Sequence, residues 1–108
     1  MVRLPTALGP AHSQALSATP VSMSSRLTLR RHRHVPAFLL AALRLRRVFR
    51  RTQGGVTLEL SAQPLRRTFW TYSSWTDDQS MNAYVSHPSH VEVMRRFQAE
   101  MVESIFRP

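Results

Sequence analysis

Two residue types, cysteine and lysine, are missing from this chain of 108 residues. Without cysteine, disulfide frameworks, zinc fingers, iron–sulfur ligation and thiol nucleophiles are excluded. All 15 basic residues are therefore arginine, and acidic residues are absent from positions 1–58, which hold ten of the arginines. Such an asymmetry is typical of a polyanion-binding face or of a solvated basic segment.

A long hydrophobic run is also missing. The longest apolar stretch, residues 35–43, is shorter than the roughly 20 residues that cross a bilayer. Residues 1–22 carry no continuous hydrophobic block of the secretory type and are interrupted by prolines and a glycine. We therefore expect a flexible tail over 1–22, an α+β domain over 23–108 and a cytoplasmic location. A transit peptide, or a true start at Met23, is the alternative explanation of the tail.

Hydrophobic periodicity predicts three strands and three helical segments. Alternating side chains indicate strands over 25–31, 56–60 and 68–75. Helical spacing indicates helices over 36–51 and 77–86, the second beginning with a capping box from Thr76 to Gln79. After the His87-Pro88 break, an apolar helical stripe runs from Val91 to Ile105.

The order β-α-β-β-α predicts an α+β, ferredoxin-like fold in which the fourth strand is truncated or missing. The strand over 68–75 is aromatic on both faces, with Trp70 and Tyr72 on one and Phe69 and Trp75 on the other. A strand that is apolar on both sides is buried on both sides. Because the chain is small, we expect the second cover to come from another subunit.

One segment has a recognisable pattern. An aromatic strand ends in Trp75-Thr76-Asp77, a helix follows with Tyr84 near its end, and Ser86-His87-Pro88 breaks it before His90 opens the next helix. Together with the Arg30-x-x-x-x-Val35-Pro36-x-Phe38 helix and the Gly54-Gly55 strand, this resembles the antibiotic-biosynthesis-monooxygenase-like group over about residues 24–106.

The resemblance implies a dimeric α+β barrel, in which two sheets close across a homodimer and a cleft between sheet and helices holds the ligand. It also implies two chemistries, cofactor-free oxygenation and haem degradation. The haem-binding pattern is not matched, because its tryptophan falls on Tyr84, its histidine falls on Met94 and its first-strand asparagine is absent.

The candidate site residues follow from these elements and from the resemblance. We expect His90 as general base and Tyr72 as donor, in a pocket for a small aromatic molecule lined by Trp70, Trp75 and Tyr84, with no cofactor and no metal. The alternatives are a structural His90, or a metal site with His87 three residues away. Trp70, Tyr72 and Trp75 are alternatively ordinary core.

The basic cluster over 30–34 and the arginines of the 36–51 helix raise a separate hypothesis. Arginines contact phosphates in a salt-dependent way, but no aromatic residues interleave with them and no nucleic-acid motif is present. A solvated face is the favoured interpretation. Three functions thus remain: a monooxygenase-like protein acting on an aromatic or phenolic substrate, a non-catalytic dimer that binds a ligand or partner, and a weak nucleic-acid binder.

Overall fold

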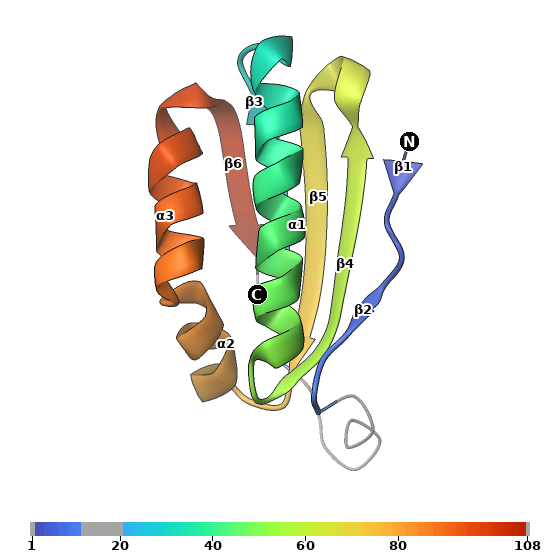
Figure 1. The fold of residues 1–108 in the computed structure, drawn as a ribbon, viewed down its shortest axis with the longest axis vertical. Helices are drawn as coiled ribbons and strands as arrows, with labels where there is room; N and C mark the ends of the chain where they lie inside the picture. Colours follow the sequence, from blue (N-terminus) through green and yellow to red (C-terminus); the bar gives the residue numbers. More distant parts are fainter. Residues whose placement is uncertain (1, 12–20, 108) are drawn as a thin grey trace.

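The computed structural model describes residues 2–11 and 21–107. Three helices cover one face of an antiparallel sheet (Figure 1). The helices are α1 (Val35–Arg51), α2 (Asp78–Val85) and α3 (Pro88–Phe97). The strands are β1 (Val2–Arg3), β2 (Ala7–Leu8), β3 (Val21–Leu29), β4 (Gly55–Gln63), β5 (Thr68–Trp75) and β6 (Met101–Arg107). Their order in the sheet is β1-β4-β5-β3-β6, with β2 also paired to β4.

The central strand β5 matches the predicted strand 68–75 and pairs with β4 on one side and β3 on the other. Its side chains alternate as expected. Phe69 and Trp75 are buried beneath the helices, whereas Trp70 and Tyr72 lie on the opposite face. In the described part of the chain, no helix covers that opposite face (Figure 1).

Helix α1 confirms the predicted helix over 36–51. Pro36 stands in its first turn, where a backbone N–H has no helical partner. Phe38, Ala41 and Phe49 are buried against the sheet, because they recur on one side of the helix. After the helix ends, Gly54 takes a left-handed backbone conformation with φ of 87°, which turns the chain into β4.

Two clusters of buried side chains form the core. The first is centred on Phe38, whose ring lies 4.7 Å from that of Phe69 and 5.1 Å from that of Phe97. The second is centred on Trp75, whose ring lies 5.0 Å from both Phe49 and Tyr84. These edge-on and tilted contacts are favoured geometries for aromatic pairs.

The prediction that the fourth strand is truncated or missing is wrong. Helix α3 ends at Phe97, a short 3₁₀ turn covers Gln98–Glu100, and β6 then pairs antiparallel with β3. The apolar stripe that suggested a helix up to Ile105 therefore belongs to two elements. The ferredoxin-like order is complete, with β6 at the edge of the sheet next to β3.

Part of the segment that was expected to be a flexible tail pairs with the sheet in the structure. Val2 pairs with Ala62 and Ala7 pairs with Leu58, so β1 and β2 run along the outer edge of β4. Strand β3 begins at Val21, ahead of the expected domain start at Met23. Residues 12–20 of the expected tail lie outside the described residues.

The helix cap at the start of α2 differs by one residue from the expected one. Asp77, not Thr76, occupies the N-cap, and its carboxylate accepts a hydrogen bond of 2.7 Å from the Ser80 N–H. This bond lowers the pKa of the Asp77 carboxyl. An aspartate caps as well as a threonine does, and the helix begins at Asp78, one residue later than expected.

Candidate functional site

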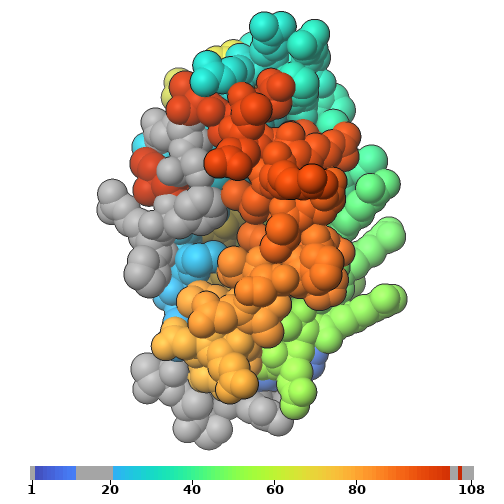
Figure 2. Space-filling model, turned by 90° about the vertical axis from the view of Figure 1, so that its left-hand side faces the viewer, coloured from blue at the N-terminus to red at the C-terminus, as the bar shows by residue number. Residues whose placement is uncertain are grey.

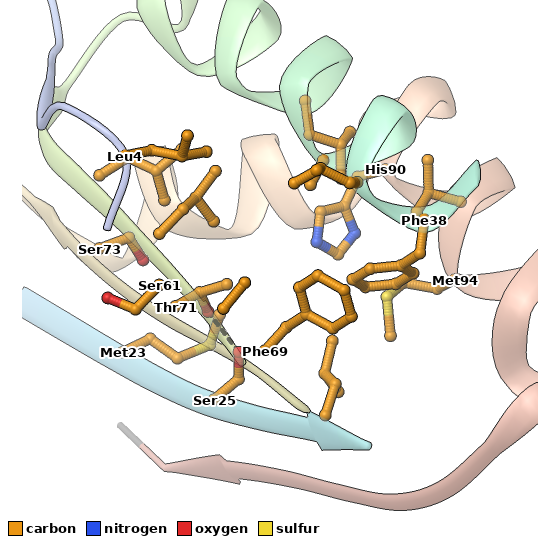
Figure 3. A pocket seen from close by; sticks show the side chains of 18 of the residues that line it. Leu4, Met23, Ser25, Phe38, Ser61, Phe69, Thr71, Ser73, His90 and Met94 are labelled. Carbon is orange, nitrogen blue, oxygen red and sulfur yellow. Dashed lines mark hydrogen bonds between the residues drawn. The ribbon is translucent and has the colours of Figure 1, made fainter. Parts of the chain in front are cut away.

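A cavity of about 160 Å³ lies between the helix-facing side of the sheet and helices α1–α3 (Figure 3). Its walls are mostly apolar and come from every layer of the fold. They include Met23 and Leu27 from β3, Leu58 and Leu60 from β4, Phe69 from β5, Phe38 and Leu45 from α1, and Val93 and Met94 from α3. The sequence-predicted residues His90 and Tyr84 line the same cavity.

His90, in the first turn of α3, is the ionisable side chain best placed for chemistry in this cavity. Its pKa is lowered from 6.5, first by burial, with a smaller contribution from the nearby His87, while a hydrogen bond to the Val85 backbone opposes the shift. The imidazole is therefore neutral at pH 7. Because one ring nitrogen donates to a backbone carbonyl, the other carries a lone pair that can accept a proton.

Tyr84 packs against the imidazole of His90. Its ring centroid lies 5.2 Å from that of His90, and its hydroxyl donates a long hydrogen bond of 3.5 Å to the Leu45 carbonyl. Burial raises the pKa of Tyr84 well above its ordinary value, so the phenol stays protonated. Tyr84 thus contributes a rigid aromatic wall between α2 and α1.

The floor of the cavity carries hydroxyl groups from the sheet. Ser25 on β3 and Thr71 on β5 are hydrogen-bonded to each other, and Ser73 accepts a hydrogen bond of 3.1 Å from the Trp75 indole N–H. Ser25 and Ser73 are buried, and Figure 3 shows these hydroxyls on the sheet side of the cavity, across from His90. The sequence analysis did not single them out, since short hydroxyl residues in a strand carry no distinctive signal.

The structure does not bring Tyr72 to His90. Tyr72 is 42% exposed on the open face of the sheet, where it pairs with Glu59 and Ser24. Trp70 lies on that face too, over a shallow hollow formed with Arg26 and Ile105. Neither aromatic side chain lines the cavity, because residues of even and odd number in β5 point to opposite faces.

Trp75 is on the helix side of the sheet but does not line the cavity either. It is fully buried between Phe49 and Tyr84, so it belongs to the core, which was the alternative interpretation of this residue. Of the five candidate site residues, His90 and Tyr84 therefore share one cavity, whereas Trp70, Tyr72 and Trp75 lie elsewhere.

His87 caps helix α3 in this structure. Its Nδ1 accepts a hydrogen bond of 3.1 Å from the Ser89 N–H, so the ring caps α3. Among residues 2–11 and 21–107, no group of three or more histidine or acidic side chains could hold a metal ion. Within the same described residues, no helix is long and apolar enough to cross a membrane.

The arginines of α1 lie mostly on its outer surface. Arg44, Arg47, Arg50 and Arg51 are exposed, and Figure 2 shows extended side chains of the green segment projecting away from the body of the molecule. Exposed arginines are expected both of a solvated basic face and of a polyanion-binding face, so their exposure does not decide between the two. Arg46 differs, because it is partly buried and its guanidinium donates a hydrogen bond of 2.9 Å to the Pro5 carbonyl.

Comparisons with known proteins show what this arrangement is similar to. No family model matches the chain, and no curated protein matches it significantly. Solved structures do match. A candidate monooxygenase from Lactobacillus acidophilus has a TM-score of 0.73 at 9% identity, covering 94% of this chain. This chain spans only 45% of that protein's length.

Two further matches are of similar size to this chain. SnoaB from Streptomyces nogalater, a cofactor-independent oxygenase, has a TM-score of 0.67 at 18% identity over 84% of this chain and 93% of its own. A candidate antibiotic biosynthesis monooxygenase from Bacteroides thetaiotaomicron has a TM-score of 0.72 at 11% identity, over 81% of this chain and 84% of its own. The chain therefore has the α+β, ferredoxin-like fold of the antibiotic biosynthesis monooxygenase structures.

Proposed function

We propose that this chain is a monooxygenase-like protein that binds a small aromatic or phenolic molecule in the cavity and oxidises it with molecular oxygen and no cofactor. The supporting observation is a neutral imidazole, that of His90, in the wall of an apolar cavity. An engineered apolar cavity of about 150 Å³ binds benzene. The cavity's volume of about 160 Å³ therefore favours a single-ring phenol or hydroquinone as substrate.

The chemistry begins with proton transfer. The free nitrogen of His90 accepts the proton of a phenolic hydroxyl, and the resulting phenolate is electron-rich enough to react directly with oxygen. Electrons pass from the ring to O₂, a ring C–O bond forms, and the O–O bond then breaks with loss of water. Hydroquinone and O₂ thus give hydroxyquinone and water. General-base help of this kind contributes about 10²–10⁴-fold to the rate.

The hydroxyl groups of the cavity floor act as the hydrogen-bond donors, which is the role that the sequence analysis expected of Tyr72. As the phenolate forms, Ser25 and Thr71 stand on the sheet side of the ring, and a hydroxyl can rotate to donate to an oxyanion. A buried donor aimed at a developing charge is worth more than the same donor in water. In this arrangement the base comes from α3 and the donors come from β3 and β5.

The proposal includes a homodimer that packs through the open face of the sheet. Trp70, Tyr72 and Ile105 lie on that face, beside Arg26 and Glu59. A domain of this size buries only a little over about 60% of its unfolded surface on its own. A second sheet packed on this face buries Trp70 and Tyr72, and the strand β5 is then buried on both of its faces.

Oxygen uptake tests the proposed function. Wild-type protein is mixed with hydroquinone in air-saturated buffer, and consumption of oxygen is followed with an electrode. We expect His90→Ala to lower turnover at least roughly tenfold while the melting temperature shifts by only a few degrees. His87→Ser is the matched control, because it removes the neighbouring imidazole and keeps a side chain that caps α3.

Two results contradict the enzymatic proposal. The first is an unchanged rate per folded molecule in His90→Ala, which makes His90 a structural residue. The second is the absence of oxygen uptake by the wild-type protein over a panel of single-ring polyphenols, which favours the non-catalytic ligand-binding dimer.

A further inference from the structure

The segment from Val2 to Leu8, here called the N-terminal strap, forms part of the cavity wall. It runs antiparallel along β4, and Val2 and Leu4 both line the cavity. The strap is tied to β4 by backbone pairing and by a hydrogen bond of 3.0 Å from the Leu4 N–H to the Leu60 carbonyl. Figure 3 shows Leu4 at the end of the cavity away from Phe38 and Met94.

Two anchors hold the strap in place just after Leu4. The Arg46 guanidinium on α1 donates to the Pro5 carbonyl across 2.9 Å, which joins the strap to the helix layer. Further along, Ala7 is fully buried against the second core cluster, the one centred on Trp75. Leu4 is therefore held between a helix and a strand, with its side chain directed at the cavity.

We propose that Leu4 is a specificity-determining residue, which limits the cavity to ligands with a single aromatic ring. The inference rests on the proposed function only in taking this cavity as the ligand site. The walls opposite Leu4 are parts of helices and of the central sheet, which are fixed by core packing. The strap is a single edge segment, so the side chain at position 4 changes the length of the cavity without changing the core.

The size of the effect follows from the volumes involved. At about 160 Å³ the cavity is close in size to an engineered apolar cavity that binds one benzene ring, and we expect a fused second ring to be accommodated less well. Shortening Leu4 to alanine extends the cavity at the strap end and leaves His90 and the hydroxyl groups of the sheet in place. A pocket that gains or loses a few methylene groups changes its preference between ligands by about 10–200-fold per methylene.

Ligand binding in the absence of turnover tests this proposal. Phenol and naphthol are titrated into the full chain by isothermal calorimetry, so that no oxidation is needed for a signal. We expect the wild type to bind phenol more tightly than naphthol. Leu4→Ala is expected to raise the affinity for naphthol at least roughly tenfold. Leu8→Ala is the matched control, since Leu8 is 51% exposed in the same strap and does not line the cavity.

A second variant tests the opposite direction. Leu4→Phe fills the strap end of the cavity, and we expect it to weaken phenol binding while the melting temperature is retained. The proposal is overturned if Leu4→Ala and wild type have the same preference between the two ligands, or if Leu8→Ala shifts that preference as much. It is also overturned if the wild type binds neither ring.

The outcomes separate this proposal from the proposed function. Selective ring binding that depends on Leu4, without oxygen uptake from hydroquinone, supports the strap's role and contradicts the oxygenase. Oxygen uptake that depends on His90, with a ligand preference insensitive to Leu4, supports the oxygenase and contradicts the strap's role.

Discussion

The imidazole of His90 and the phenol of Tyr84 lie in contact, with ring centroids 5.2 Å apart and planes inclined at 65°. The contact joins α3 to α2 and turns both rings toward one cavity. It also shields part of the imidazole from water, and burial is the largest cause of the lowered pKa of His90. The property that suits His90 to accept a proton is thus produced by its packing.

The first prediction concerns stability against pH. Because the pKa of His90 is lower in the folded chain, the unfolded chain binds a proton first as the pH falls. The stability from a neutral His90 is fully present above its unfolded pKa of 6.5 and is lost as the pH falls through the folded value. We expect His90→Gln to reduce the fall in unfolding free energy between about pH 7 and 5.

Urea unfolding at several pH values measures this effect. His32→Gln is the control, because His32 lies in an exposed 3₁₀ turn away from the cavity. Equal slopes in the wild type and in His90→Gln would show that His90 is as easily protonated in the folded chain as in the unfolded one.

The second prediction concerns Trp75, which is a core residue in this structure. Trp75→Ala removes a fully buried indole from contact with Phe49 and Tyr84, and we expect it to lower the free energy of unfolding by about 3–5 kcal/mol. Denaturant unfolding measures the loss. Leu65→Ala, at an 88% exposed side chain, is expected to stay within about 0.5 kcal/mol of wild type. Similar small effects of both substitutions would argue against a packed Trp75.

The third prediction concerns assembly through the open sheet face. Tyr72→Arg places a cation beside its strand partner Glu59, so the single chain keeps a favourable pair. In a two-fold interface the partner's sheet would remove this charged pair from water, which is costly, and we expect a monomer by light scattering at micromolar concentration. Val91→Arg, on the exposed side of α3, should remain a dimer. A wild-type protein that is monomeric under these conditions contradicts the proposed homodimer.

The fourth prediction concerns the close approach of the N-terminal segment to β4. A Cβ atom at Gly9 would lie 2.2 Å from the Gly55 carbonyl oxygen, and the Gly9 N–H donates to the Val56 carbonyl. Gly9→Ala must therefore displace this segment, and we expect a loss of about 1–3 kcal/mol in unfolding free energy.

Hydrogen exchange locates that loss. The Leu4 amide, bonded to the Leu60 carbonyl, should exchange faster in Gly9→Ala than in Pro10→Ala, whose proline is exposed. Equal exchange at Leu4 in the two variants and the wild type is the result expected of a flexible tail.

The sequence was sufficient for the elements with a regular period. Helix α1 and strand β5 were predicted closely, because their buried side chains recur at constant spacing over many residues. The alternation in β5 also placed Trp70 and Tyr72 on the face opposite Phe69. Because the helices cover only one face of the sheet, this alternation places Tyr72 on the side of the sheet opposite a histidine on a helix.

Other elements could not be predicted, for identifiable reasons. Strands of two residues, such as Val2–Arg3 and Ala7–Leu8, are too short to show a period. In β6, Met101 and Ile105 continue the helical spacing set by Phe97 by coincidence, which hid the strand. The wall formed by Leu4 depends on the pairing of distant segments, and no local pattern encodes it.

The cavity lies where the hydrophobic interior is interrupted. Phe38 belongs to one cluster of buried side chains and Tyr84 to the other, and both line the space between them. An aromatic ring in that space touches both clusters, so the interior becomes continuous when a ligand is bound. A ligand that binds only the folded chain adds about 2.7 kcal/mol at 100 times its Kd. The melting temperature of this protein is therefore itself a measure of occupancy, and it requires no turnover of the ligand.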